Sequence, residues 1–375
     1  PDALLDHLTR GPDGAGRGPA PDAMREGRVR GMAPPHQIRA DHDAPTHEVH
    51  QAHQDHAPAL AEDPGEPTVP GDASGPGGGT DPAGHQGAAT PPPTTPYRPL
   101  DITVPFPELR AHARTATRLH PRPGAPTAAD SSVGGPLLWP ADEAWPVCRE
   151  TGHAGRPERH DGRLRPLLGI AQFHARDVPD LAAFAPPGTD LLQVLWCPFD
   201  GHDDGGSSDF GPSTRLFWRR AADVTRLLPE QPEAEVQHSW YRPRPCLLHP
   251  ERIVEYPWAD YLPPALVERI EAWEDDFQER VGRAAPTYQY DLSLAPGWKI
   301  GGWDSWHRTD LVRVHCGTCG AEMRLLLTMD HTEHQASWGP FPPVGSPTGV
   351  AAGRDEYRAF VCPADPAHPH RMSTQ

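Results

Sequence analysis

Cysteines and histidines near the end of the chain have the types and spacing of zinc ligands. Residues 316–320 read Cys-Gly-Thr-Cys-Gly. In a zinc ribbon the two thiolates of such a turn bind one tetrahedral Zn²⁺, and the glycine permits the tight knuckle. A further cysteine and two histidines follow within 362–370. The pattern predicts a structural zinc site with four ligands: Cys316, Cys319, Cys362 and His368.

The fourth ligand of this site has competitors. His368 fits best, and His370, Asp365 and His315 are alternatives. Thiols without a metal are the other interpretation, because short motifs also occur outside metal sites. A ribbon zinc has a closed coordination shell, so it would stabilise the fold without conferring an activity.

Two other places combine residues that bind metals. Cys148 and His153 form a second Cys/His pair, for which we prefer a buried core thiol over a metal-binding pair. Four aspartates between 200 and 209 lack the spacing of an EF-hand, so we expect a solvated loop there.

A histidine tract near the start of the chain repeats every third residue: His47, His50, His53 and His56. On a helix, such residues share a face, and neutral imidazoles there would bind Zn²⁺ or Ni²⁺. Pro45 and Pro58 leave little room for a stable helix. The preferred interpretation is a solvated low-complexity tract, with metal binding through it as an alternative function.

Residues 301–307 read Gly-Gly-Trp-Asp-Ser-Trp-His and place Asp304, Ser305 and His307 close together in sequence. A carboxylate and a nearby imidazole are able to perform acid–base chemistry. A small-molecule binder or hydrolase using this loop is therefore an alternative function. Three tryptophans would line its cleft: Trp139, Trp303 and Trp306. No Gly-x-Ser-x-Gly elbow is present, and the preferred interpretation is a loop that packs its tryptophans.

The elements that must position these residues lie after Tyr97, the first aromatic residue of the chain. The 50 prolines and 36 glycines indicate unstructured segments. Residues 1–96 lack the apolar bulk needed to offset the entropy of ordering, so we predict a disordered Pro/Gly/His-rich tail there. Residues 97–375 are predicted to form one domain, with a zinc-knuckle subregion at 311–372.

Apolar runs bounded by proline and glycine predict the secondary structure of this domain. A helix with an apolar stripe is expected over 263–281, and a second helix over 107–119. Strands are expected over seven segments: 101–105, 166–173, 190–197, 214–219, 311–315, 323–328 and 357–361. Short strands with few helices indicate an α+β fold built largely of antiparallel sheet.

The overall charge and hydropathy exclude several function classes. The formal net charge of −17 disfavours nucleic-acid binding. No run of 18 apolar residues predicts a membrane helix, and no secretory signal is visible at the start of the chain. Six cysteines in such a chain favour thiols or metal ligands in a reducing compartment, so we expect a cytoplasmic protein.

Four stretches resemble the YwqG-like family, a bacterial domain of unknown function. They are 132–140 with the Trp-Pro at 145–146, 166–173, 186–193 and 299–303, and their order carries the resemblance. The family's Gly-Gly-aromatic turn is commonly followed by a glutamine, where this chain has Ser-Trp-His at 305–307. Some relatives end in a Cys-Pro-x-Cys-Pro run, in which Asp365 stands at the second cysteine. The resemblance implies a single, largely antiparallel α+β domain with no established reaction.

The sequence thus favours a binding module over an enzyme, because no convergent catalytic set is evident. Tryptophan and arginine are abundant, and both are typical of protein interfaces. The acidic charge would suit a basic protein partner, as an immunity protein that inhibits a toxin would need.

Overall fold

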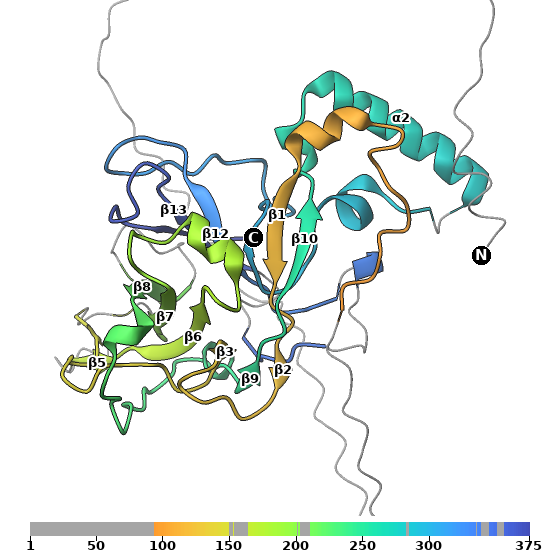
Figure 1. Ribbon diagram of the computed structural model, residues 1–375. Coiled ribbons are helices and arrows are strands. Elements are labelled where there is room, and N and C mark those ends of the chain that lie inside the picture. The colour runs from red at the N-terminus through yellow and green to blue at the C-terminus, as the bar shows by residue number, and fades with distance from the viewer. Residues whose placement is uncertain are drawn as a thin grey trace, which may run out of the picture. The chain divides into compact units, whose positions relative to one another are not determined.

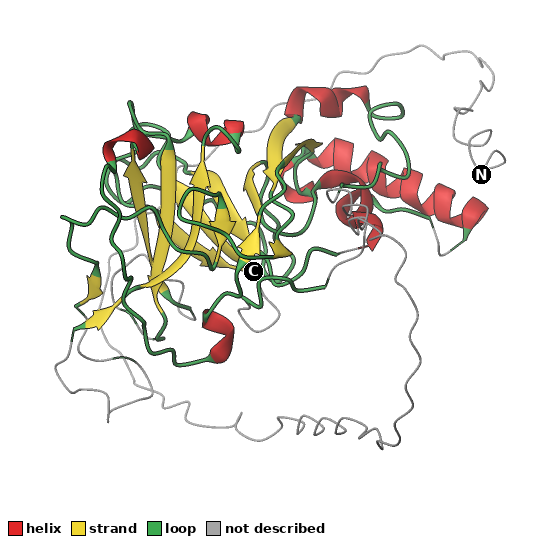
Figure 2. Cartoon of the chain, turned by 60° about the horizontal axis from the view of Figure 1, so that its bottom comes forward, coloured by secondary structure: helices red, strands yellow, loops and turns green. Residues whose placement is uncertain are grey.

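The computed structural model describes residues 94–149, 153, 164–200, 202, 211–282, 285–334, 336–338, 345–350 and 356–375. The predicted tail lies outside the described residues up to position 93. Among the described residues, the chain is mainly antiparallel β-sheet with few helices, as predicted (Figures 1 and 2).

The first sheet has six strands, and every pairing in it is antiparallel. Their order in the sheet is β10 (Glu251–Glu255), β1 (Arg114–Arg118), β11 (Lys299–Gly301), β12 (Arg324–Met329), β13 (Tyr357–Val361) and β14 (Arg371–Thr374).

The second sheet also has six strands, again paired antiparallel. Their order is β2 (Arg122–Pro123), β9 (Cys246–Leu247), β3 (Ser132–Val133), β6 (Leu168–His174), β7 (Leu191–Cys197) and β8 (Ser213–Arg219). A separate two-stranded ribbon joins β4 (Val147–Cys148) to β5 (Arg165–Pro166).

One hydrophobic core is shared by the two sheets. Leu192, Val194 and Trp196 of β7 belong to the same buried cluster as Leu327 of β12 and Tyr357 of β13. The rings of Trp196 and Tyr357 lie 5.8 Å apart between centroids. Alternate residues of a strand point to opposite faces, so each sheet turns one row of side chains into this core and the next row away from it.

The long helix α2 (Pro264–Val281) follows the prediction closely. Leu266, Ile270 and Phe277 of its apolar stripe are buried, and Trp273 stacks on Phe277 at 5.3 Å. Proline occupies the first turn, where its missing N–H needs no partner. Gly282 ends the helix with a φ of +88°, a conformation that favours glycine.

The remaining helices are short. They are η1 (Pro107–His112), η3 (Pro179–Ala183), η4 (Ala221–Asp223), η5 (Ser239–Tyr241), η6 (Ala259–Tyr261), η7 (Tyr288–Ser293) and η8 (Ala336–Trp338).

Three predicted elements are wrong. Residues 101–105 form a turn, because Asp101 accepts hydrogen bonds from the backbone N–H and the hydroxyl of Thr103. The helix expected over 107–119 is a 3₁₀ turn followed by β1, whose pairing with β10 and β11 overrides the helical propensity of its arginines and alanine. Residues 311–315 form no strand beyond one bridge between His315 and Glu322.

A row of three cations and one threonine crosses the face of the first sheet that points away from the shared core. Arg118 pairs with Lys299 across strands, Lys299 with Thr328, and Thr328 with Arg358. All four are at most 2% exposed. Adjacent like charges repel, so buried cations in such a row need their own counter-charges. Each cation has a glutamate: Glu333 for Arg118, Glu255 for Lys299 and Glu356 for Arg358.

Candidate metal centres

The structure brings together the four predicted zinc ligands near the C-terminus. The ligand atoms of Cys316, Cys319, Cys362 and His368 all lie within 4.8 Å of one another. Cys319 Sγ is 3.5 Å from Cys362 Sγ. His368 Nδ1 is 3.5 Å from Cys316 Sγ and 3.4 Å from Cys362 Sγ.

Two neighbouring strands place these ligands at the same end of the first sheet. The Cys-x-x-Cys turn ends just before β12, and Cys362 directly follows β13. Arg324 at the start of β12 pairs with Val361 at the end of β13, so the turn and Cys362 meet. Gly320 closes the turn with a φ of +73°, and its N–H donates to the Cys316 carbonyl at 2.9 Å. The sequence places glycine where the backbone requires a left-handed residue.

The competing ligands lie elsewhere. His370 Nε2 is 3.0 Å from the carbonyl of Thr214, and His315 Nδ1 is 3.0 Å from the carbonyl of Arg313. Asp365 Oδ2 lies 3.8 Å from His368 Nε2, the ring nitrogen that faces away from the thiols. A carboxylate behind the second nitrogen of a ligating histidine orients the ring in many zinc sites.

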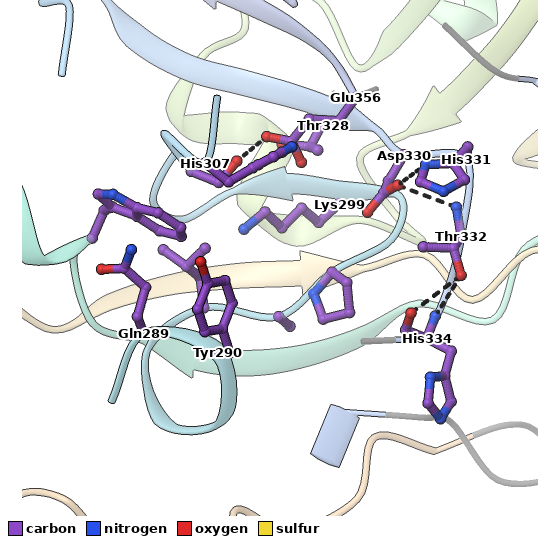
Figure 3. Close-up of a pocket in the computed structure, with 15 residues that line it drawn as sticks. Gln289, Tyr290, Lys299, His307, Thr328, Asp330, His331, Thr332, His334 and Glu356 are labelled. Carbon is purple, nitrogen blue, oxygen red and sulfur yellow. Dashed lines mark hydrogen bonds and ion pairs between the residues drawn. The ribbon is translucent and has the colours of Figure 1, made fainter. Parts of the chain in front are cut away.

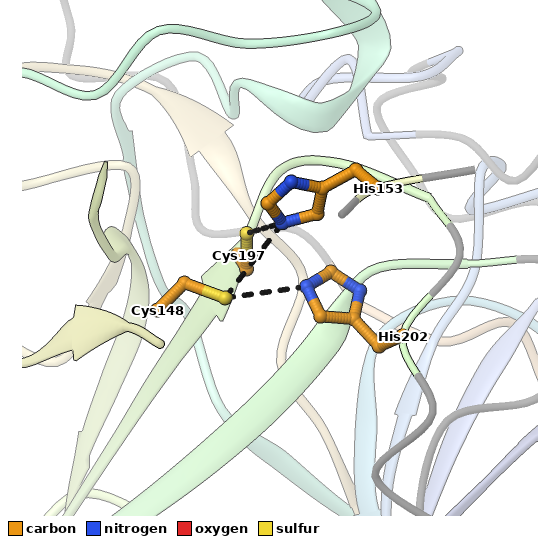
Figure 4. A group of neighbouring side chains, drawn as sticks. All are labelled: Cys148, His153, Cys197 and His202. Atoms are coloured by element: carbon orange, nitrogen blue, oxygen red, sulfur yellow. Dashed lines mark hydrogen bonds between the residues drawn. The ribbon is translucent and has the colours of Figure 1, made fainter. Parts of the chain in front are cut away.

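A second cluster combines two cysteines and two histidines, which converge from separate segments (Figure 4). Cys148 ends β4 and Cys197 ends β7, while His153 and His202 follow them in the chain. Cys148 Sγ is 3.7 Å from His153 Nε2 and 3.4 Å from His202 Nε2, and Cys197 Sγ is 3.4 Å from His153 Nε2. All four ligand atoms lie within 4.8 Å of one another.

Sequence reasoning found only half of this second cluster. Cys148 and His153 were recognised as a pair, but the core-thiol interpretation was preferred, and Cys197 and His202 were missed. The signal is a repeated spacing, because Cys148 precedes His153 by five residues and Cys197 precedes His202 by the same number. Each Cys-x₄-His pair is weak alone, and only the fold shows that the two halves meet.

Both clusters are compatible with zinc binding. Zinc–sulfur bonds of about 2.3 Å and zinc–nitrogen bonds of about 2.0 Å place neighbouring ligand atoms roughly 3.3–3.8 Å apart. The measured separations of 3.4–3.7 Å fall in this range. Thiolate and imidazole ligands select zinc over calcium or magnesium, which take oxygen ligands. Five of the six cysteines belong to the two clusters, and the sixth, Cys246, is buried in the shared core.

The electrostatics of the two clusters differ. The backbone N–H groups of Cys319 and Thr318 help to lower the pKa of the Cys316 thiol to about 6, which favours the thiolate that binds metal. The neighbouring Cys148 thiol and burial raise the pKa of Cys197. A divalent cation between these two sulfurs would reverse that effect, because thiolates bound to a metal stay deprotonated.

The loop at 301–307 packs Trp303 and Trp306 into one hydrophobic cluster, as the preferred interpretation predicts, and does not form the alternative acid–base group. Asp304 is buried and accepts hydrogen bonds from Tyr261 at 2.8 Å and from the Trp306 ring at 2.6 Å. Ser305 hydrogen-bonds to Glu356, and His307 is exposed at the rim of a cavity. The expected three-tryptophan cleft does not form, because Trp139 packs in a different hydrophobic cluster from Trp303 and Trp306.

The predicted histidine tract at 47–56 lies outside the described residues. Among the residues that the structure describes, no helix combines the length and apolar character needed to cross a bilayer. No protein-family model matches the chain, and no curated protein matches it. The geometry of the two Cys/His clusters is therefore the basis for any functional assignment.

Proposed function

We propose that this chain is a binding module whose fold is held by two structural zinc ions, one in each Cys/His cluster. The observation that supports this proposal is that eight ligand atoms, all thiol or imidazole, form two groups of four, each within 4.8 Å of one another. Each group already supplies four ligands, which closes the zinc shell and leaves no open position for a substrate. This supports a role in stability over a role in catalysis.

The proposed binding role extends to the class of partner and to the location of the protein. The acidic charge of −17 would attract a basic protein partner, and an immunity-like inhibitor is one module of that kind. Thiolate ligands persist best in a reducing compartment, which supports the cytoplasm as its location. The resemblance to the YwqG-like family is part of this proposal and adds no reaction to it.

Elemental analysis of the purified full chain tests the zinc assignment. We expect about two zinc ions per chain, one for each four-ligand group. Cys316→Ser should retain only the zinc of the second cluster, and His202→Ala only the zinc of the first. Cys246→Ala is the matched control, because Cys246 is a buried thiol outside both clusters. Wild-type protein without zinc, after purification free of chelators, would refute the proposal.

A further inference from the structure

A cavity lies on the outer face of the first sheet, away from both metal centres. It has a volume of about 400 Å³, which is in the range of small-molecule sites. Lys299 and Thr328 of the charged cross-strand row form its floor. Figure 3 shows Lys299 with Gln289 and Tyr290 on one side and His307, Thr328 and Glu356 on the other.

Lys299 is the only lysine of the chain, and its ammonium group donates all of its hydrogen bonds to other groups of the protein. Its Nζ donates to both carboxylate oxygens of Glu255, at 2.8 and 3.0 Å, and to the carbonyl of Trp303 at 3.0 Å. An ammonium has three donors, so none is left for a ligand. Arg358 is not among the residues that line the cavity, and it donates to the Ser305 carbonyl and to the Ser373 hydroxyl, at 2.7 Å for the latter. An anionic ligand in the cavity would therefore find the ammonium of Lys299 already occupied.

The groups that remain for a ligand include buried acceptors. The Thr328 hydroxyl is buried, and it has no hydrogen-bond partner among the described residues. Asp330 and Glu356 both line the cavity with side chains about one-tenth exposed. Glu356 faces Arg358, whereas Asp330 lies 3.0 Å from Nδ1 of His331 and accepts the backbone N–H groups of Gly297 and Thr332, each at 3.1 Å.

An aromatic wall completes the cavity. Trp258 and Tyr290 both line it, and their rings meet edge to face with centroids 6.0 Å apart. Aromatic faces attract ammonium and guanidinium groups, and they do so more strongly where water is excluded. Carboxylates, an unpartnered hydroxyl and aromatic rings together form the chemistry of a cation-binding site.

We propose that this cavity binds a small organic cation that carries an ammonium group. The ammonium would donate to the Thr328 hydroxyl and to the carboxylates of Glu356 and Asp330, with its carbon chain against Trp258 and Tyr290. The inference is independent of the zinc centres, because none of their ligands lines the cavity.

Three probes of equal length test this inference by calorimetry on the zinc-loaded full chain. They are the diamine putrescine, the four-carbon diol and the dianion succinate, at up to about 10 mM, in about 0.15 M salt to screen the acidic surface. We expect putrescine to bind at one site and the other two probes to give no heat of binding. Equal binding of succinate or the diol, or no binding of putrescine, would overturn the proposal.

Two variants distinguish an effect on binding in the cavity from an effect on the stability of the fold. Thr328→Val removes an unpartnered buried hydroxyl, so it should leave the melting temperature equal or higher while weakening putrescine binding roughly tenfold. Glu356→Gln removes a carboxyl group at the cavity, whose pKa burial raises to about 7, and should also weaken binding above that pH. Glu322→Gln is the matched control, because it removes the same group from an exposed ion pair with Arg313. Binding that Thr328→Val and Glu356→Gln leave unchanged would place putrescine elsewhere and reject the assignment. Zinc content measured on the same samples keeps this outcome separate from the zinc proposal.

Discussion

At the scale of single residues, the pairing of Lys299 with Glu255 explains why one lysine occurs in a chain whose other strong cations are arginines. The compact ammonium fits between the carboxylate of Glu255 and the carbonyl of Trp303. A planar guanidinium is larger and cannot point three donors at one converging set of acceptors. Gly302 has a φ of +79°, and a β-carbon there would overlap with Glu255. Glycine at position 302 is thus required by the ion pair beside it.

The buried glutamate Glu333 should make stability depend on pH. Burial raises its pKa from 4.5 to about 7, although Arg118 opposes the shift. Between these values the folded state binds more protons than the unfolded state, so this group's contribution to stability is lost as pH rises toward 7. The full shift corresponds to roughly 3 kcal/mol.

Glu333→Gln should abolish that contribution. The free energy of unfolding, measured by denaturant titration between about pH 5 and pH 8, should fall less steeply with pH in the variant than in the wild type. Both proteins are compared with zinc bound, because protonation of the zinc ligands gives the opposite slope in this range. Identical slopes would show that Glu333 ionises normally.

At the scale of elements, the proposed zinc centres would tie strand ends together, and β4 is the strand that backbone pairing holds least. β4 has two residues and pairs with a two-residue β5, so few hydrogen bonds hold it. Cys148 at its end meets Cys197 at the end of β7. The C-terminal centre joins the turn before β12 to the segment after β13. Bonds to a metal supply stability where a short ribbon cannot.

His202→Ala should therefore loosen one region only. We expect amide hydrogen exchange about tenfold faster or more in β4 and at the end of β7, because local opening no longer breaks a metal bond. β13 and β14 should exchange at the wild-type rate. His315→Ala is the control, since His315 is an exposed histidine outside both clusters. Faster exchange throughout the domain would indicate that the second centre does not act on β4 and the end of β7 alone.

At the scale of the whole molecule, the two centres serve different sheets that share one core. The first sheet holds the C-terminal ligands beside β12 and β13, and the second sheet carries Cys197 on β7. Leu327 and Val194 of the two sheets belong to one buried cluster. Loss of both metals should therefore weaken both sheets and the core that they share.

Removal of zinc should lower the melting temperature of the full chain. A ligand that binds only the folded state stabilises it, and structural zinc binds tightly. We expect a strong chelator to lower the midpoint by at least about 5 °C, and zinc but not magnesium to restore it. Calorimetry with parallel elemental analysis measures this. A metal-free protein that melts at the zinc-loaded temperature would contradict a structural role.

Local patterns in the sequence determined much of this protein. The stripe of α2, the runs that became β6, β7, β8, β12 and β13, and the Cys-x-x-Cys-Gly turn were all readable, because each depends on residues close together in the chain. For the fourth metal ligand at the C-terminus, spacing and composition favour His368 over three alternatives. The structure brings His368 to the thiols.

Only the tertiary structure decided which distant residues meet. The turn at 101–105 and the strand β1 depend on side-chain and cross-strand hydrogen bonds that no local pattern contains. Cys197 and His202 join Cys148 and His153 because β7 and β4 end at the same place. The buried row of Arg118, Lys299, Thr328 and Arg358 likewise depends on the register of four strands. Periodicity reports which face of an element is buried, whereas register and sheet order select the residues that face each other across it.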